Sequence, residues 1–319
     1  MSSELQSKRV IIIFHRADYD GLFSGNIARK FYIENGYKVD MKGWNYGDDV
    51  PNFQDIINKY SEICILDISF DPSIMKTLNE TGKAYWIDHH IGTIRDSEEN
   101  GYSNFPGSRT KEKISAAEVA WNYFYKGIET PHIIELISAY DVWDHDRFSW
   151  DDEVTPIQYA LRANYGLNAE KLWRDWDSLV NTDYDECEDS EMFFDNLLNS
   201  GSTILQYLKS VWKSWCSNYA FEVVVAGKYK GICMLSAQPG SLQFESVLGE
   251  KKYDVQVVVN RKGPDKYNVS IYKESDDCND FDCSWYASKV YGTGNGHKSA
   301  AGFLINLEQF ETLIKEQKI

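Results

Sequence analysis

The sequence lacks the long apolar segments that mark membrane and secreted proteins. It contains no apolar run near the length of about 18 residues that a transmembrane helix requires. The early run VIIIF, residues 10–14, is too short for the core of a signal peptide and is followed by no small-residue cleavage site. We therefore expect a protein without a membrane span that stays in the cytoplasm.

Cysteine is scarce and is not arranged for zinc. The six cysteines include no CxxC pair, and no histidine lies beside them at zinc-finger spacing. We interpret them as free thiols. Cys64, within SEICILD, is typical of a small apolar residue buried in a strand.

Basic residues are also few. Lysine and arginine number 33 against 49 acidic residues, and the net charge is −16. A protein that follows a long phosphodiester backbone normally presents a basic stripe, so this composition argues against long duplex nucleic acid as a partner. We interpret the acidic runs at 183–191 and 274–282 as exposed loops, with calcium or partner sites as the alternative.

What is present indicates a folded protein of about two domains, since 43% of the 319 residues are hydrophobic. Residues 8–146 alternate β-branched runs with amphipathic stretches, which predicts an α/β domain with a mainly parallel sheet. The segment 92–113 has no periodicity and is predicted to be a loop. The expected strands lie at Arg9–Phe14 and near 37–44, 63–69 and 83–90, and the expected helices at 21–36, 72–82, 115–127 and 131–140.

The composition and the expected secondary structure change twice in the rest of the chain. Residues from about 150 to 220 are rich in tryptophan and predict a helical connection. From Phe221 onward we expect two hairpins, a glycine-rich segment at 292–303 and a last amphipathic helix. The predicted domains are 1–185, 186–218 as a helical connector, and 219–319.

Histidines and aspartates follow the apolar runs at the ends of the expected elements. The histidines are accompanied by carboxylates rather than by cysteines, which favours a borderline-to-hard divalent ion such as Mn²⁺. The carboxyl ends of strands in open α/β sheets converge on one crevice, so these residues predict a hydrolytic metal centre. The set is His15, Asp18, Asp20, Asp67, His89, His90 and Asp141.

Each of these residues taken alone is more simply a helix cap or turn residue. Helix caps and turns alone would rarely place six potential metal ligands at the ends of four successive strands or helices. Two divalent ions about 3.5–4 Å apart can activate water and stabilise the leaving oxygen of a phosphoryl displacement. Asp67 is placed to bridge two such ions, and His89 and Asp141 would complete the shell of the second.

The motifs HRADYDG, ILD, IDHH and AYD, in that order, resemble the four motifs of the DHH phosphoesterases. GNGHKSAAGF resembles the signature of their DHHA1 companion domain, and the likeness covers roughly residues 9–306. HRADYDGLFSG and SAAEVAW are most similar to the nanoRNase branch, which hydrolyses short oligonucleotides. The resemblance implies an α/β fold with a DHH domain, a helical connector and a smaller DHHA1-like α/β domain.

The resemblance also implies roles for residues. His15 and Asp18 would hold one Mn²⁺, with Mg²⁺ or Co²⁺ as alternatives. Asp20, His89 and Asp141 would hold the other ion. Asp67 would bridge the two ions, and His90 would face the scissile phosphate.

In the second domain the resemblance implies contacts of His297 and the amides of Gly294, Asn295 and Gly296 with phosphate or base. Glycine lets backbone approach phosphate closely. The strand where the family often has Ser-Leu-Arg-Ser reads Val-Ser-Ile-Tyr-Lys here, so the expected arginine is missing. The candidates to replace it are Lys273, Arg261 and Lys298, although lysine lacks the bidentate fork of arginine.

Two further residues near the motifs are considered for a role at the site. Tyr19 lies between the aspartates of the first motif and could stack on a base. His145 closely follows Asp141 and is interpreted either as a support for the metal centre or as a surface residue.

These observations predict a two-lobed, metal-dependent phosphodiesterase that converts short oligoribonucleotides to mononucleotides. The alternatives are a phosphodiesterase of cyclic or linear dinucleotides, a nucleotide phosphatase, and a nucleotide-binding sensor without turnover. The expected partner is a short oligonucleotide or dinucleotide, and a homodimer is one assembly that the sequence allows.

Overall fold

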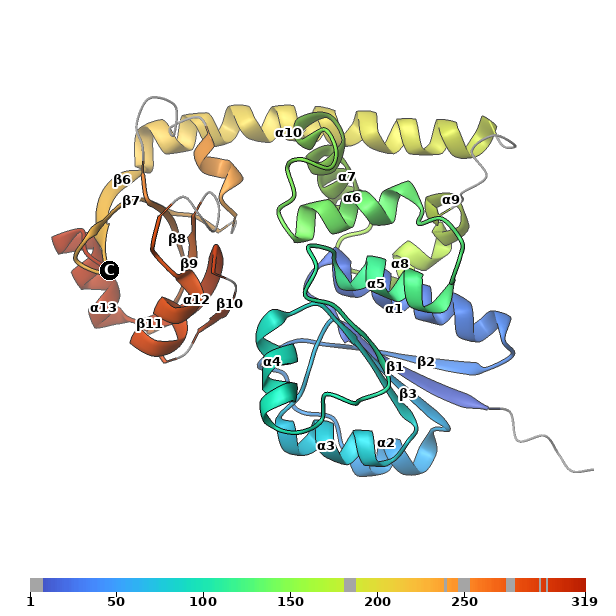
Figure 1. Ribbon diagram of the computed structural model, residues 1–319. Coiled ribbons are helices and arrows are strands. Elements are labelled where there is room, and N and C mark those ends of the chain that lie inside the picture. The colour runs from blue at the N-terminus through green and yellow to red at the C-terminus, as the bar shows by residue number, and fades with distance from the viewer. Residues whose placement is uncertain are drawn as a thin grey trace, which may run out of the picture. The chain divides into compact units, whose positions relative to one another are not determined.

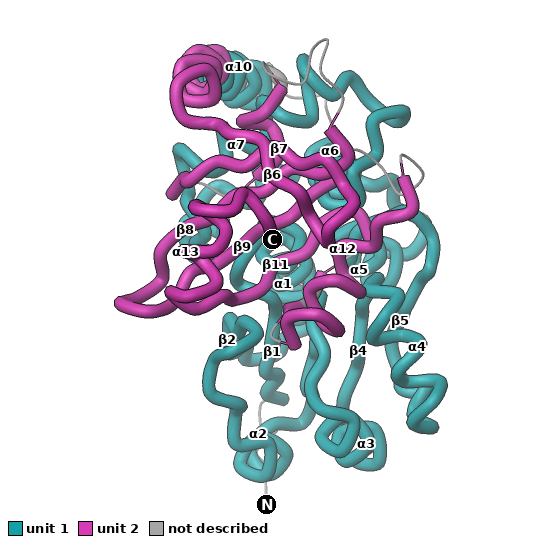
Figure 2. The backbone as a smooth tube through the Cα atoms, turned by 90° about the vertical axis from the view of Figure 1, so that its left-hand side faces the viewer, with its two compact units in different colours: residues 1–205 teal, residues 206–319 magenta. Residues whose placement is uncertain are grey.

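The computed structural model describes residues 8–180, 188–237, 240–245, 253–273, 279–292, 294–296 and 298–319. Its contacts divide the chain into two compact units, residues 1–205 and 206–319 (Figure 2). Helix α10 (Glu188–Tyr219) runs across this division. The three-part division inferred from the sequence stays a prediction.

Unit 1 contains a parallel sheet with the strand order β2-β1-β3-β4-β5, as the alternating pattern of the sequence predicts. The strands are β1 (Arg9–His15), β2 (Lys38–Trp44), β3 (Glu62–Leu66), β4 (Ala84–Asp88) and β5 (Gly107–Arg109). Because all five run in the same direction, the residues that follow them gather at one edge of the sheet.

The prediction of a loop over 92–113 is wrong in part, since only residues 100–106 and 110–113 lie outside helices and strands. Helix α4 (Ile91–Glu99) and strand β5 lie in this segment. α4 buries only Ile94 and Ser97, so it shows little of the apolar periodicity that reveals a helix. β5 is three residues long and half-buried, too short for a recognisable alternation.

Helices cover both faces of this sheet because successive strand residues point to opposite sides (Figure 1). Val10, Ile12 and Phe14 join one core, and Ile11 and Ile13 join the other. The first core includes residues of α1 (Tyr19–Glu34), α5 (Ala116–Phe124), α6 (His132–Asp141), α7 (Thr155–Asn164), α8 (Ala169–Arg174) and α9 (Trp176–Val180). The second includes residues of α2 (Phe53–Lys59) and α3 (Pro72–Glu80).

Unit 2 contains a mixed sheet with the order β10-β11-β9-β8-β7-β6, in which only the β7–β8 pairing is parallel. Its strands are β6 (Phe221–Val225), β7 (Tyr229–Leu235), β8 (Val255–Gly263), β9 (Lys266–Tyr272), β10 (Asn295–Gly296) and β11 (Ala300–Asn306). The predicted hairpins β6–β7 and β8–β9 are confirmed. α12 (Cys283–Trp285) and α13 (Leu307–Glu316) add residues to the core of this sheet.

The cysteines that the structure describes are free, as predicted. Cys64, Cys216, Cys233 and Cys283 are all buried thiols. Within the described ranges, no helix has both the length and the apolar character needed to cross a membrane.

Candidate metal centre

The predicted ligands lie at the carboxyl edge of the unit 1 sheet. His15 is the last residue of β1, Asp67 follows β3 directly, and His89 follows β4. Asp18 and Asp20 lie at the start of α1, and Asp141 is the last residue of α6. The sheet and two helix ends therefore bring together side chains that the sequence separates by more than one hundred residues.

α1 can start close to β1 because Gly21 has no side chain. A Cβ at this position would lie 2.1 Å from the carbonyl oxygen of His15. Asp18 caps the helix and accepts a hydrogen bond from the Gly21 amide at 3.0 Å. The glycine is thus required by close packing between the strand end and the helix start.

The ligand atoms form three overlapping groups, in each of which the atoms lie within 4.8 Å of one another. The groups are His15, Asp18 and Asp67; Asp20, His89 and Asp141; and Asp67, His89 and His90. The first two correspond to the two ion shells that the sequence suggested. Asp67 links them, since one of its oxygens lies 3.4 Å from His15 Nδ1 and the other 3.6 Å from His89 Nε2.

Asp67 has an unusual backbone as well as a central position. Its φ of 59° lies in the left-handed region, which non-glycine residues rarely adopt. The side chain is 2% exposed, and its buried Oδ1 has no hydrogen-bond partner in the structure. Strained backbone and an unsatisfied buried oxygen are typical of functional sites.

Asp20 is fixed by the amino end of α5. Its two carboxylate oxygens accept hydrogen bonds from the amides of Ala116 and Ala117, at 2.9 and 2.6 Å. Helix amino ends favour negatively charged groups, so the start of α5 is a favourable partner for this buried side chain. Its Oδ2 lies 3.5 Å from His89 Nε2.

The donor set suits a divalent cation. Burial, and then the negative charges of Asp20 and Asp18, raise the pKa of Asp67 well above its usual range. Burial lowers the pKa of His89, which keeps its imidazole neutral, the form that binds metal. A cation would relieve the repulsion among the carboxylates and occupy the unsatisfied oxygen of Asp67.

The repulsion predicts how the stability of metal-free protein depends on pH. A carboxyl whose pKa is raised on folding stabilises the protein at low pH and loses that contribution as pH rises through the folded-state pKa. In chelator, we expect the melting temperature of the wild type to fall as the pH rises from the usual carboxyl range through the raised pKa of Asp67. Asp67→Asn should flatten this dependence, and Mn²⁺ should raise the melting temperature of the wild type far more than that of the variant.

Glu80→Gln is the matched control for this measurement, because Glu80 is an exposed carboxyl on α3. Its melting curves should follow the wild type at each pH. Equal pH dependence in Asp67→Asn and the wild type would show that the cluster is not the source of the effect.

Asp88 is a further residue of the candidate site, which the sequence interpretation treated only as part of a motif. It is fully buried, and its Oδ1 accepts hydrogen bonds from the amides of His89 and His90 at 2.8 and 3.1 Å. The same oxygen lies 2.7 Å from His90 Nδ1, and Thr93 donates to Oδ2 at 3.1 Å. Asp88 therefore fixes the backbone and the ring that follow β4.

Asp88 and His90 shift the pKa of one another. Burial alone would raise the pKa of Asp88, but the charge of His90 and its hydrogen bonds lower that pKa to about 2. Burial alone would lower the pKa of His90, but the charge and hydrogen bond of Asp88 raise that pKa to about 9. In the metal-free protein His90 is therefore an oriented imidazolium at neutral pH.

An aromatic cluster follows Asp141 directly. The rings of His145 and Trp150 stack with centroids 3.9 Å apart, and the Trp143 ring meets Trp150 edge-on at 4.7 Å. Trp143 has a φ of 56°, a second left-handed residue beside the candidate ligands. The sequence signal was the density of aromatic residues around His145, which we interpreted only as a support or surface position.

The interpretation of Tyr19 as a base-stacking residue is wrong. Its ring is 3% exposed, and its hydroxyl donates a hydrogen bond to the carbonyl of Gly166 at 2.8 Å. Tyr19 is a core residue of α1 because it faces the neighbouring helices rather than the cluster.

The predicted substrate residues of the second domain lie in unit 2. Gly294 packs tightly, since a Cβ there would lie 2.5 Å from the Gly302 carbonyl, and Gly296 has a φ of 150°. Asn295 pairs with Gly302 in the β10–β11 ladder, and Lys298 is exposed. His297 lies outside the described residues.

Two of the cations proposed to replace the missing arginine have local partners. The Arg261 guanidinium donates to the carbonyl of Gly263 at 2.9 Å, within the turn between β8 and β9. Lys273 is 4% exposed and donates to the carbonyl of Asn279 at 3.3 Å. Their assignment to substrate stays a prediction, as does that of the other residues in this unit.

Comparison with known proteins supports the fold. No family model and no curated sequence matches the chain. Among solved structures, the DHH domain of a member of the s1p family of ribosomal proteins matches with a TM-score of 0.56, 16% identity, and coverage of 98% of this chain and 88% of that one. A pGpG-specific phosphodiesterase, PggH from Vibrio cholerae, matches with a TM-score of 0.51, 15% identity, and coverage of 97% and 96%.

RecJ from Thermus thermophilus, solved in complex with Mn²⁺, matches with a TM-score of 0.54 and 14% identity over 97% of this chain. The chain spans about half of that protein, 51% of its length. Together these matches show that the chain has the DHH-domain fold that its motifs predicted, with a second, smaller α/β unit. Its placement in the nanoRNase branch stays a prediction.

Proposed function

We propose that this protein is a phosphodiesterase that uses two divalent ions, Mn²⁺ in the first instance, to hydrolyse short oligoribonucleotides or dinucleotides to mononucleotides. The observation that carries the proposal is that two clusters of carboxylates and imidazoles lie at one edge of the sheet, with the two oxygens of Asp67 reaching 3.4 Å from His15 Nδ1 and 3.6 Å from His89 Nε2. A set with no missing member favours turnover over a nucleotide sensor that only binds. Divalent ions bound there would activate water and stabilise the charge that develops on phosphate.

The chain itself would hold the ions and orient the substrate. His15 and Asp18 would bind one ion; Asp20, His89 and Asp141 would bind the other; Asp67 would contact both. His90, held by Asp88, would place a positive N–H donor toward a phosphate oxygen. The Mn²⁺ in the RecJ structure and the dinucleotide specificity of PggH support the choice of metal and substrate class.

A short substrate agrees with the charge of the protein. A net charge of −16 offers no extended basic track for a long backbone, whereas a dinucleotide needs only a few direct contacts. The direct test is a panel of dinucleotides, pentanucleotides, long RNA, cyclic dinucleotides and pyrophosphate with Mn²⁺. Dinucleotides and pentanucleotides should be cleaved fastest, and equal efficiency on long RNA would contradict the proposed substrate class.

The aromatic cluster after Asp141 provides a surface for a base. His145 forms the exposed end of the ring stack with Trp150, four residues beyond a candidate ligand. Stacking on aromatic rings contributes roughly 1–3 kcal/mol per base, so His145→Ala should raise the KM for a dinucleotide about fivefold with little change in kcat. A dinucleotide analogue with hydrogen in place of each base should show no such loss.

His132→Ala is the matched control, because His132 lies at the opposite end of α6 from Asp141. It should leave the KM of both substrates unchanged. A rise in KM for the base-free analogue in His145→Ala would instead indicate that His145 supports the metal centre, the other interpretation of this residue.

A further inference from the structure

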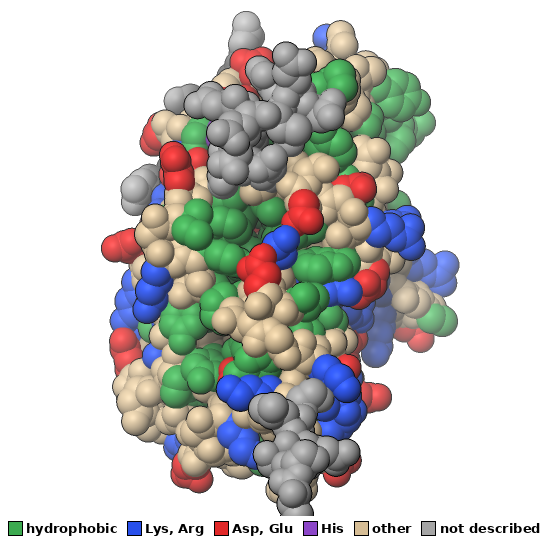
Figure 3. Space-filling model, turned by 90° about the vertical axis from the view of Figure 1, so that its right-hand side faces the viewer, with side chains coloured by type: hydrophobic (Ala, Val, Ile, Leu, Met, Phe, Trp, Pro, Cys, Tyr) green, Lys and Arg blue, Asp and Glu red, His purple; other side chains and the backbone are tan. Residues whose placement is uncertain are grey.

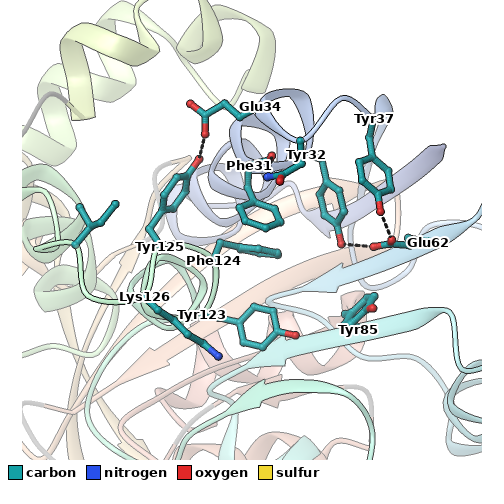
Figure 4. A pocket seen from close by; sticks show the side chains of 12 residues that line it. Phe31, Tyr32, Glu34, Tyr37, Glu62, Tyr85, Tyr123, Phe124, Tyr125 and Lys126 are labelled. Atoms are coloured by element: carbon teal, nitrogen blue, oxygen red, sulfur yellow. Dashed lines mark hydrogen bonds between the residues drawn. The ribbon is translucent and has the colours of Figure 1, made fainter. Parts of the chain in front are cut away.

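A cavity lies in unit 1, at the amino edge of the sheet (Figure 4). Its volume is about 670 Å³, within the usual range for small-molecule sites. Glu62 at its wall is the first residue of β3, and Tyr85 is the second residue of β4. The candidate ligands follow the other ends of these strands, about 16 Å away at the usual rise per residue, so the cavity is separate from the metal centre.

The cavity is lined mainly by aromatic rings. Five tyrosines and two phenylalanines contribute to its wall, and the rings of Phe31 and Phe124 lie 4.9 Å apart in its middle (Figure 4). The carboxyl end of α1 and the start of β2 lie at the right of Figure 1, the side that Figure 3 faces. Hydrophobic side chains gather in the middle of that face, with acidic and basic ones among them (Figure 3).

One end of the cavity carries a carboxylate held by phenols. Glu62 accepts hydrogen bonds from the hydroxyls of Tyr32 and Tyr37, at 2.8 and 2.5 Å (Figure 4). Each carboxylate oxygen is thus paired with a neutral donor and retains a second lone pair. The hydrogen bond to Glu62, with burial, raises the pKa of Tyr37 to about 12, so the phenol remains a donor.

Ammonium groups of the chain itself lie against two tyrosines that contribute to the wall. Lys126 Nζ lies 5.6 Å from the centroid of the Tyr123 ring, the distance of a cation–π contact. Lys8 Nζ lies 5.4 Å from the centroid of the Tyr37 ring. A second carboxyl, Glu34, contributes to the wall and accepts a hydrogen bond from Tyr125 at 3.1 Å.

We propose that this cavity binds a small organic cation, with its ammonium group on the Glu62 carboxylate and its carbon atoms against the aromatic rings. The wall contains two carboxylates and one lysine, which disfavours phosphate and other anions. Glu34 already pairs with the Lys30 ammonium at 3.6 Å, so the cation is assigned to Glu62. Aromatic faces beside a carboxylate favour ammonium ions both by cation–π attraction and by charge. A neutral guanine base could also donate to a carboxylate, but it would gain nothing from the net charge of the wall. The proposal does not depend on the phosphodiesterase activity.

The test is isothermal titration calorimetry of the full chain with putrescine. Butanediol, which has the same length without charge, is the matched ligand control, and guanosine tests the alternative occupant. We expect saturable binding of putrescine and none of butanediol or guanosine. Saturable binding of guanosine, or equal binding of butanediol and putrescine, would overturn the assignment to a cation.

Variants separate this cavity from the acidic metal centre, which could also attract an amine. Glu62→Gln should weaken putrescine about tenfold or more, and Tyr123→Leu about fivefold, because they remove the ion pair and one ring face. Asp67→Asn and the surface control Glu80→Gln should bind as the wild type does. Loss of binding in Asp67→Asn with retention in Glu62→Gln would place the amine at the metal centre and refute the proposal.

Folding of each variant is checked by its thermal melting curve. Glu62 is bonded to two buried or half-buried tyrosines, so its replacement could destabilise unit 1. Tyr123 is half-buried and lies on the helix surface, so Tyr123→Leu still tests the cavity if Glu62→Gln fails to fold. Wild-type affinity in a folded Tyr123→Leu variant would then contradict the proposal.

Discussion

Asp67→Asn is expected to reduce hydrolysis of a dinucleotide by more than about 10³-fold, because one carboxylate would serve both ions. Asparagine is the sharper test than alanine at this position. Asn tolerates the left-handed backbone that Asp67 adopts at a φ of 59°, whereas alanine adds strain of its own. The effect of Asp67→Asn can therefore be assigned to the lost charge, and Asp67→Ala should be at least as inactive.

The measurement combines initial rates in Mn²⁺ with metal content by elemental analysis. Asp67→Asn should lose both activity and bound metal, whereas a variant at a ligand of one ion, such as Asp141→Asn, should lose less metal. Asp177→Ala is the control, since Asp177 is an 82% exposed aspartate of the same unit. Full activity of the wild type in chelator, or a wild-type rate for Asp67→Asn, would contradict the two-ion centre.

The sequence predicts this centre because parallel strands obey a simple rule. Apolar runs followed by Asp or His predicted where β1, β3 and β4 end, and the carboxyl ends of parallel strands share one edge. Proximity of His15, Asp67 and His89 follows from that rule alone. The rule does not cover Asp141, because this residue ends a helix, and the position of a helix relative to the strands does not follow from the strand order.

What the sequence could not predict depends on backbone conformation and on long-range contacts. Nothing local marks Asp67 as left-handed. The bond between Asp20 and the amino end of α5 joins residues 96 positions apart. Tyr19 was misplaced for the same reason, because the rotation of α1 about its axis, which the motif does not encode, decides whether a residue faces the core or the site.

The aromatic cavity also depends on long-range contacts, so the sequence did not predict it. Its wall combines the end of α1, the starts of β3 and β4, and the end of α5, and none of these segments carries a binding motif of its own. The tyrosines are spread along the sequence and are compatible with ordinary core positions. Only their convergence around Glu62 distinguishes them.

His90→Ala is expected to retain bound metal and to lose rate by roughly 10²- to 10⁴-fold, the range for acid or electrostatic assistance. The geometry is the reason to expect that His89 binds metal and that His90 acts on substrate. His89 Nε2 faces the carboxylates of Asp20, Asp67 and Asp141 at 3.3–3.6 Å. His90 instead directs Nδ1 to Asp88 at 2.7 Å, and Asp67 lies farther from that nitrogen, at 3.7 Å.

Asp88→Asn separates the charge of Asp88 from its structural role, because the amide oxygen can still accept from the backbone amides of His89 and His90. Without the carboxylate, the pKa of His90 should fall from its raised value of about 9. The alkaline limb of the rate profile should therefore move to lower pH in Asp88→Asn and vanish in His90→Ala.

The double variant that combines Asp88→Asn with His90→Ala completes a double-mutant cycle. If Asp88 acts on the reaction only through His90, then Asp88→Asn should cause no further loss of rate in the His90→Ala background. Single-turnover kinetics and metal content measure the two contributions separately. If His90→Ala contains no metal, then His90 is a metal ligand, as its proximity to Asp67 and His89 allows. If the losses of rate in the double variant are additive, then Asp88 acts independently of the His90 ring, by holding the end of β4.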